Sequence, residues 1–345
     1  MPEKNELSAS IPMRVVGPAR ITGPVMDEEV SIPLATYESP LWPSVSRGAR
    51  VSVAAGGIRA VVLDDRMARS VLLEAEGAGQ AAEVLRLLAN RRSELADAAR
   101  EGSRYTTLLD VHHQVVGNLL YLRFEFDTGD AAGHNMATAA AERAANWILG
   151  VMPSLRHVSI SGNYCSDKKT SAVNGILGRG KNVVTELDVP RALCEKLLRT
   201  SPEKIADINV KKNLIGTLLA GGIRTANAHF ANMLLGFYLA TGQDAANIVE
   251  GSQGIVHAEA RDGDLYFSCT LPNIIVGTVG AGKNLGFVRE NLAHMGCLEE
   301  RPPGDNAKRL AVIAAAAVLC GELSLLAALT NPGELMEAHT RLERA

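Results

Sequence analysis

The sequence is poor in aromatic residues, carries no excess of basic charge and has no long hydrophobic run. Phe, Trp and Tyr make up 4% of its 345 residues, so Ala, Leu, Val and Ile must form the core. The formal net charge of −3 argues against nucleic acid or an anionic membrane surface as a partner. The longest apolar run, residues 310–320, has eleven residues, whereas a membrane-spanning helix needs about 20. Since the first residues also form no apolar signal segment, we expect a soluble, cytoplasmic protein.

Motifs of several other protein classes are missing as well. The five cysteines form no CxxC pair, which suits a reducing compartment and gives no indication of a metal site. No GxGxxG follows an N-terminal strand and no GxSxG occurs, so neither a Rossmann domain nor an α/β-hydrolase is supported. Residues 175–182 and 277–284 imitate a P-loop, but Asn stands where a Ser or Thr hydroxyl would hold Mg²⁺. We interpret both as tight turns, and the second could still approach a cofactor phosphate through its backbone N–H groups.

The order of the predicted elements indicates one domain inserted into another. Residues 11–60 are read as short strands and turns. Periodicity then predicts a helix over 80–100, strands over 106–116 and 118–126, a helix over 130–149 and a strand over 157–161. Further helices are predicted over 190–200, 227–241 and 307–329, with strands over 254–279. A chain of this length fits two domains, so we expect a small α+β domain with parts of a larger one on both sides.

The loop at residues 159–169, SISGNYCSDKK, is the segment richest in reactive side chains. It resembles the SGNYCTDKK loop of hydroxymethylglutaryl-CoA reductases. Five more segments resemble signatures of that family, in the same order: ATYES (35–39), INVKKNLIG (208–216), ANAHFAN (226–232), GQDAAN (242–247) and GTVGAGKNL (277–285). The resemblance extends over residues 11–339, so the chain is identified as a member of the family.

The resemblance implies an α+β fold in two domains. A large mixed α/β domain, residues 1–70 and 160–333, would bind the acyl-CoA, and an inserted ferredoxin-like, non-Rossmann domain, residues 71–159, would bind the dinucleotide. Residues 334–345 would form a short closing segment. The family also implies a homodimer or higher oligomer with active sites between subunits. The usual N-terminal helical region is not visible in these residues, which fits a soluble prokaryotic type with a different dimer contact.

The resemblance also implies a set of functional residues. The catalytic ones are Glu38, Lys168, Asp244 and His339. Those expected to contact substrate are Arg47, Arg69, Ser161, Asn163, Asp167, Lys169, Lys212, His229 and Asn232. Those expected to contact the cofactor are Ser103, Arg104, Tyr105, Asp130, Gly133, His134, Asn135, Val279, Gly280 and Arg344. No metal is implied.

These residue types suit the reduction of a thioester to an alcohol. Each of the two hydride transfers puts negative charge on the former carbonyl oxygen, and a lysine ammonium such as Lys168 can stabilise it. Collapse of the thiohemiacetal releases a CoA thiolate, which an imidazolium such as His339 can protonate. Glu38 is the expected proton donor of the later reduction. With Asp244 and Lys168 it should titrate as one coupled unit.

The expected activity is therefore NADPH-dependent reduction of hydroxymethylglutaryl-CoA to mevalonate and CoA. NADH stays possible, because Glu343 stands beside Arg344 where a carboxylate could repel a 2′-phosphate. Tyr37, Pro40 and Pro43 surround Glu38 and could reshape the acyl pocket. The NAD-linked reverse reaction, a related acyl-CoA and a catalytically silent acyl-CoA-binding homologue are the alternatives.

Overall fold

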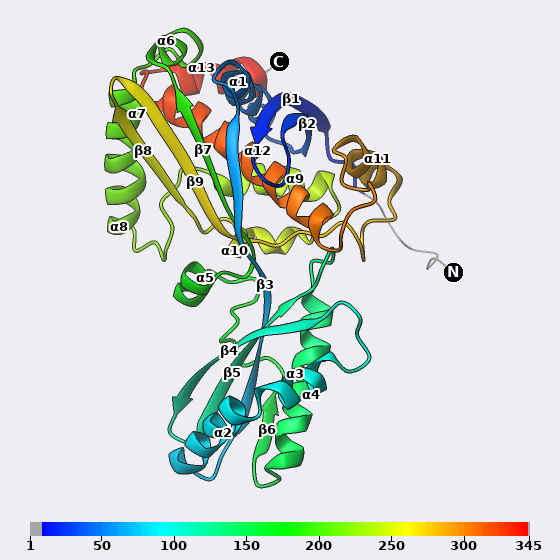
Figure 1. Cartoon of the computed structure of the whole chain (residues 1–345). Coiled ribbons are helices and arrows are strands. Elements are labelled where there is room, and N and C mark those ends of the chain that lie inside the picture. The colour runs from blue at the N-terminus through cyan, green and yellow to red at the C-terminus, as the bar shows by residue number, and fades with distance from the viewer. Residues whose placement is uncertain (1–8, 344–345) are drawn as a thin grey trace.

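Two lobes share one long strand in this protein (Figure 1). The computed structural model describes residues 9–343, with side chains through residue 337 and at residue 340. Strand β3 (Ile58–Glu74) runs from the upper, large lobe into the lower, small lobe. Its first part pairs with β1 (Met13–Thr22) and β7 (Gly180–Val189), and its second part pairs with β5 (Leu119–Asp127) and β6 (Arg156–Ser159).

The small lobe has ferredoxin-like topology, as expected. After β3 the chain forms α2 (Ala78–Asn90), α3 (Arg92–Arg100), β4 (Thr107–Val116), β5, α4 (His134–Val151) and β6. All pairings are antiparallel, in the order β6-β3-β5-β4. The alternating side chains Leu120, Leu122, Phe124 and Phe126 of β5 are buried in a core of their own. The predicted helix over 80–100 is broken at Arg91, which separates α2 from α3.

The large lobe has the strand order β2-β1-β3-β7-β9-β8, with β2 (Glu28–Ala35), β8 (Ile255–Arg261) and β9 (Asp264–Ile274). The interpretation of residues 11–60 as strands and turns is wrong for helix α1 (Leu41–Ala54). Leu41, Val45 and Ala49 recur at helical spacing and are buried. Pro43 lies in the first turn of this helix, where a proline breaks no backbone hydrogen bond.

Helix α12 (Asp305–Leu329) forms the centre of the large lobe. By length and composition alone it could cross a membrane, but 94% of its most apolar window is buried inside the protein, as in a core helix. Helix α1 packs very close to it: a Cβ at Gly48 would lie 2.1 Å from the carbonyl oxygen of Cys320. Only glycine fits at this crossing.

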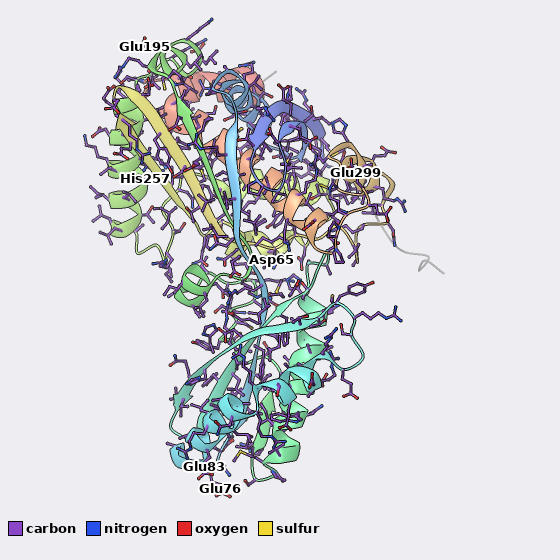
Figure 2. The ribbon with its side chains drawn as sticks, in the orientation of Figure 1. Asp65, Glu76, Glu83, Glu195, His257 and Glu299 are labelled. Carbon is purple, nitrogen blue, oxygen red and sulfur yellow. The ribbon has the colours of Figure 1, made fainter. Side chains whose placement is uncertain are left out.

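Short helices complete the large lobe. They are α5 (Ala172–Leu177), α6 (Arg191–Leu193), η1 (Cys194–Leu198), α7 (Pro202–Ile208), η2 (Asn209–Gly216), α8 (Thr217–Leu219), α9 (Phe230–Ala240), η3 (Ala245–Asn247), α10 (Ile248–Gly251), α11 (Gly286–His294) and α13 (Glu334–Glu343). Along η2 and α8, the apolar side chains of Val210, Leu214, Ile215, Leu218 and Leu219 are exposed, the last two by 78% and 83%. Asp65 lies where the lobes meet (Figure 2). Its carboxylate accepts a hydrogen bond of 3.0 Å from the Lys181 ammonium.

Candidate active site

Lys168 and Asp244 form the central ion pair of the candidate site. Lys168 lies on the loop that follows β6, and Asp244 lies between α9 and η3, where its carboxylate also accepts the N–H of Ala246 at 3.1 Å. The Lys168 Nζ is 2.6 Å from the Asp244 Oδ2. This bond raises the pKa of Lys168. Burial is the largest influence on the pKa of Asp244 and acts to raise it, but the bonds from Lys168 and the Ala246 N–H, together with the charge of Lys168, lower that pKa overall. Both groups therefore stay charged at neutral pH.

The rest of the loop gathers more of the expected residues. Asp167 forms ion pairs with Arg179 at 3.0 Å and with Arg69 at 3.6 Å. The Lys169 ammonium donates to the carbonyl oxygen of Asp167 at 3.1 Å. Two further expected substrate residues, Ser161 and Asn163, are exposed on the same loop. Arg179, which is almost fully buried, is a member of this cluster that the sequence did not reveal.

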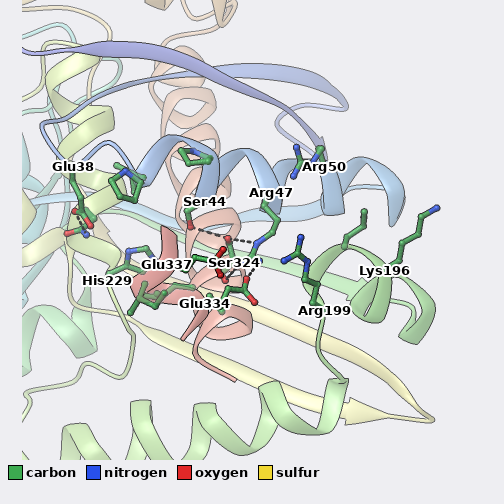
Figure 3. A pocket seen from close by; sticks show the side chains of 18 residues that line it. Glu38, Ser44, Arg47, Arg50, Lys196, Arg199, His229, Ser324, Glu334 and Glu337 are labelled. Atoms are coloured by element: carbon green, nitrogen blue, oxygen red, sulfur yellow. Dashed lines mark hydrogen bonds and ion pairs between the residues drawn. The ribbon is translucent and has the colours of Figure 1, made fainter. Parts of the chain in front are cut away.

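A pocket of about 660 Å³ opens between α1, η1, α9, α12 and α13. Glu38 and His229 lie at one end, and Arg50, Lys196 and Arg199 lie at the other (Figure 3). At the first end, the Asn232 amide donates to the Glu38 carboxylate at 2.8 Å. The pocket thus has an acid and amide end and a basic end, which suits an elongated ligand with phosphates at one end.

The three basic residues at the far end were missed by sequence reasoning. Lys196 and Arg199 belong to a segment about 150 residues away from α1 along the chain, and no motif marks them. Arg50 could have been found, because it lies three residues after Arg47 and so on the same face of a helix.

Arg47 lies in the middle of this pocket, and its guanidinium is hydrogen-bonded to other residues of the protein. Its guanidinium donates to the Ser324 hydroxyl at 2.9 Å and to the Glu334 carboxylate at 2.6 Å. Glu334 comes from the C-terminal helix α13 (Figure 3). Burial is the largest influence on the pKa of Glu334 and acts to raise it, but the bonds from Arg47 and Asn331, together with the charge of Arg47, lower that pKa overall. The residue expected near the CoA phosphates is therefore paired with an internal carboxylate.

A buried carboxylate, Glu322 of α12, supports the acid and amide end. It accepts the N–H groups of Ala228 and His229 at 2.9 and 2.5 Å, and so fixes the start of α9. The His229 ring bonds the carbonyl oxygen of Gly321 at 3.1 Å. Burial lowers the pKa of the neighbouring Lys212, and the charge of Glu322 acts against this.

The two segments expected to hold the dinucleotide lie side by side. The carbonyl oxygen of Asp130 accepts the N–H of Thr278 at 2.8 Å, and Ala131 forms a parallel bridge with Val279. A Cβ at Gly277 would lie 2.4 Å from the backbone nitrogen of Ala132, so glycine is required there. Gly280, with φ of 100°, has open space on its side-chain face. An exposed turn and the N-terminus of α4 thus adjoin, which suits a phosphate or nicotinamide.

Asp130 and His134 link this region to other parts of the protein. The Asp130 carboxylate accepts the N–H groups of Gly304 and Ala307, both at 2.9 Å, and so caps α12. The His134 Nε2 lies 3.9 Å from the Asp167 carboxylate. Burial, helped by the charge of Arg179, lowers the pKa of His134 to about 4, so its ring is neutral.

A scan against family models matches residues 7–344 to hydroxymethylglutaryl-coenzyme A reductase. The chain belongs to this family. It is 48% identical to the 3-hydroxy-3-methylglutaryl-coenzyme A reductase of Pyrococcus abyssi, covering 97% of this chain and 82% of that protein. It is 42% identical to the enzyme of the same name from Aeropyrum pernix, covering 98% and 80%. A class II reductase of Streptococcus pneumoniae, solved bound to NADPH, shares the fold with a TM-score of 0.75 and 19% identity over 95% of this chain and 87% of that one.

Some residues expected from the reductase family are not joined to the others. Within residues 9–343, no hydrogen bond or ion pair connects Glu38 to Lys168 or Asp244. Ser103 bonds Thr106 at 2.8 Å. Arg104, Tyr105 and Asn135 are exposed. Arg344 lies outside the described residues, and the side chain of His339, in α13, lies outside the described side chains.

One cluster in this reductase has the composition of a cation site. Ligand atoms of His134, Asp167 and Glu250 lie within 4.8 Å of one another. However, the Arg179 guanidinium lies 3.0 Å from Asp167 and 2.7 Å from Glu250. It already supplies positive charge to both carboxylates, and a metal ion would have to displace it. The cluster is therefore an ion-pair network.

Proposed function

We propose that this protein reduces hydroxymethylglutaryl-CoA to mevalonate and CoA with NADPH, in the cytoplasm. The observation that carries the proposal is the Lys168–Asp244 ion pair, 2.6 Å long, on the loop that contacts the dinucleotide segments through His134. Family membership and the names of the relatives support the same reaction. The pocket with a basic end supports an acyl-CoA as substrate.

The dinucleotide would lie against the adjoining segments around Gly133 and Gly280. The side-chain face of Gly280 is open. His134, Asn135 and Val279 would contact it there, and the family resemblance also assigns cofactor contacts to Ser103, Arg104, Tyr105 and Arg344. When bound, NADPH supplies the hydride. Asp130 would contribute mainly by holding the segment in place, because both of its carboxylate oxygens accept N–H groups of α12. By their match to family arginines, Arg104 and Arg344 would favour NADPH over NADH through the 2′-phosphate.

Lys168 would stabilise the oxyanion that forms on the former carbonyl oxygen in each reduction. Its bond to Asp244 keeps it protonated and aims its ammonium. A positive charge fixed before the reaction needs no reorganisation when the oxyanion forms, which is why such groups contribute strongly to catalysis. Arg69, Ser161, Asn163, Asp167 and Lys169 would hold the hydroxymethylglutaryl group around it.

Glu38 and His339 would handle the protons. Glu38, oriented by Asn232, would protonate the alcohol oxygen of the second reduction. His339 would protonate the departing CoA thiolate. His229, whose N–H bonds Glu322, and Lys212, which lies within reach of the Glu322 charge, would complete the acyl end of the pocket.

The CoA phosphates would bind at the basic end of the pocket. Arg50, Lys196 and Arg199 converge there from two distant segments, and Arg47 lines the pocket next to them. Guanidinium groups bind phosphates through paired hydrogen bonds, so this group suits a pyrophosphate and a ribose phosphate. The two lobes would then be the two expected domains, divided at about residues 70 and 160.

We further propose a homodimer in which the active sites form between subunits. Two observations support it: Glu38 has no bond to Lys168 within the described part of one chain, and an apolar row is exposed along η2 and α8. Mixing inactive Glu38→Gln and Lys168→Ala subunits tests this. If each site draws on both chains, an equimolar mixture recovers up to about a quarter of wild-type activity, because half of the dimers are mixed and each of these has one intact site of two. If the subunits do not share sites, mixing recovers none.

The first experiment is the absorbance decay of NADPH, and in parallel NADH, with hydroxymethylglutaryl-CoA. Two oxidised cofactors per CoA released are expected, with NADPH faster and Lys168→Ala inactive. A faster reaction with NADH would favour the NAD-linked reverse reaction. If only another CoA thioester in a panel is reduced, the acyl group of the substrate is that of the other thioester. Calorimetric binding of the CoA thioester without any turnover would identify a silent homologue.

A further inference from the structure

The backbone of the Lys168 loop adopts an unusual conformation. Asn163, Ser166 and Lys168 have φ of 59°, 46° and 55°, in the left-handed region that side chains other than glycine seldom occupy. Several such residues in one short loop persist only where surrounding contacts enforce them. The contacts that hold this loop therefore decide where the Lys168 ammonium points.

Two fully buried side chains form hydrogen bonds with the backbone of the Lys168 loop. The Asn174 amide, in α5, donates to the carbonyl oxygen of Ser166 at 3.2 Å. The Glu250 carboxylate, in α10, accepts the N–H of Lys168 itself at 3.3 Å. Both side chains are 0% exposed. Asn174 and Glu250 are also within 3.4 Å of each other, so they act as one support.

Glu250 also holds the segment that carries Asp244. The Asn247 amide donates to the same Glu250 oxygen at 2.7 Å. The backbone N–H of Asn247 in turn donates to the carbonyl oxygen of Asp244 at 3.0 Å. Glu250 therefore lies between the backbones of the two partners whose side chains form the central ion pair.

The charge of Glu250 is balanced within the same network. Burial raises its pKa, and the guanidinium of Arg179 at 2.7 Å acts in the opposite direction. Buried ion pairs of this kind contribute little net stability compared with apolar packing, because desolvation cancels most of the attraction. What they provide is a fixed geometry, here around the loop that carries Lys168.

We propose that Glu250 is a positioning residue that sets Lys168 against Asp244 by holding the backbone segments of both. The proposal rests on the proposed reductase function, and Glu250 acts through Lys168 without touching substrate. Asn247 connects Glu250 to the backbone of Asp244. Asn174 connects Glu250 to the backbone of Ser166 in the loop.

The test compares Glu250→Gln with Asn247→Ala. The first removes a charge near Lys168, while the second removes only the link to the Asp244 segment and leaves every charge in place. For both variants we expect kcat to fall roughly 10- to 100-fold with the KM values of both substrates nearly unchanged, since small displacements of a catalytic group act mainly on the chemical step. Asp65→Asn is the matched control, because it breaks the ion pair to buried Lys181 at the same junction of the lobes. It should change thermal stability and leave kcat intact.

A second readout reports the position of Lys168 without any turnover. The charged groups around Lys168 are Asp244, Asp167 and Glu250, and the bond to Asp244 is the main cause of its raised pKa. If that bond loosens, more of the amine is unprotonated, and an amine-reactive reagent labels Lys168 faster. Lys169, exposed on the same peptide, is the internal reference in mass spectrometry.

Faster labelling of Lys168 relative to Lys169 in Asn247→Ala, together with the kcat loss, supports the proposal. Labelling unchanged in Asn247→Ala, or an equal kcat loss in Asp65→Asn, overturns it. If Glu250→Gln does not fold, Asn247→Ala alone decides. If the wild type reduces no acyl-CoA, the proposed function fails, and the labelling ratio still tests the position of Lys168.

Discussion

Helix α13 places a carboxylate on Arg47, and this contact should weaken the binding of CoA. An incoming phosphate must replace Glu334 at the guanidinium, where the present bond is 2.6 Å long. The substitution Glu334→Gln keeps the size of the side chain and removes its charge. Arg47 is then free to pair with phosphate, and one negative charge leaves the pocket. We expect tighter binding of CoA and of its thioesters.

The size of the gain follows from the burial of the pair. The side chains of Arg47 and Glu334 are 18% and 21% exposed, so water screens them only partly. At about 4 Å between charges and an effective dielectric constant near 20, the attraction is about 4 kcal/mol. Desolvation and side-chain ordering offset most of this, leaving about 1–2 kcal/mol. That corresponds to a roughly 5- to 30-fold lower Kd, since 1.4 kcal/mol is a factor of ten.

The assay is calorimetric titration with CoA, with KM for the thioester measured alongside. Glu337→Gln is the matched control, because Glu337 comes from the same helix and lines the same pocket without bonding Arg47. It should change the Kd by less than about twofold, through long-range charge alone. An equal gain in Glu337→Gln, or unchanged binding in Glu334→Gln, would refute the reasoning.

Four more changes test the structure. Asp244→Asn removes the bond that raises the pKa of Lys168, so the alkaline limb of the kcat profile should move to lower pH and kcat should fall. The pKa of His134 is about 4 in the folded protein, below the ordinary 6.5. The neutral ring therefore contributes fully to the free energy of unfolding above pH 6.5, and this contribution is lost as pH falls from 6.5 toward 4. Denaturant unfolding at pH 7 and at pH 4.5 should show that the free energy of unfolding falls by about 2–3 kcal/mol more in the wild type than in His134→Gln. Asp130→Ala uncaps α12 and should lower the free energy of unfolding by about 1–2 kcal/mol. Gly48→Ala should cost about 3 kcal/mol in a thermal or denaturant melt, because its Cβ would lie 2.1 Å from the Cys320 carbonyl oxygen.

Linear motifs predicted much of the candidate site. Lys168 and Asp244 lie in two separate motifs, and the structure joins them at 2.6 Å. The segments around Asp130 and Gly280 were likewise expected to share one ligand, and they lie side by side. Such segments can be predicted because their chemistry depends on residue types at fixed local spacing.

Other parts depend on tertiary packing, which the local sequence does not carry. Helix α1 falls in a stretch predicted to form strands and turns, although its apolar spacing is helical. Glu250 lies in none of the segments that resemble the family, and its proposed role follows from its hydrogen bonds to the Lys168 N–H and the Asn247 amide. Lys196 meets α1 through the folding of distant segments. Glu334 reaches Arg47 for the same reason.

Strand β3 has a mechanical consequence for the whole molecule. At about 3.3 Å per residue, its 17 residues extend over roughly 55 Å as one covalent rod. Hydrogen bonds on both edges stiffen each half of the strand, so a rigid strand joins the lobes and not a flexible linker. Along this connection, the small lobe can move relative to the large lobe only by twisting about the axis of β3 and by slight bending at the middle of the strand. A chimaera that exchanges the small lobe between relatives would need its splice inside the strand, with the register of both sheets preserved.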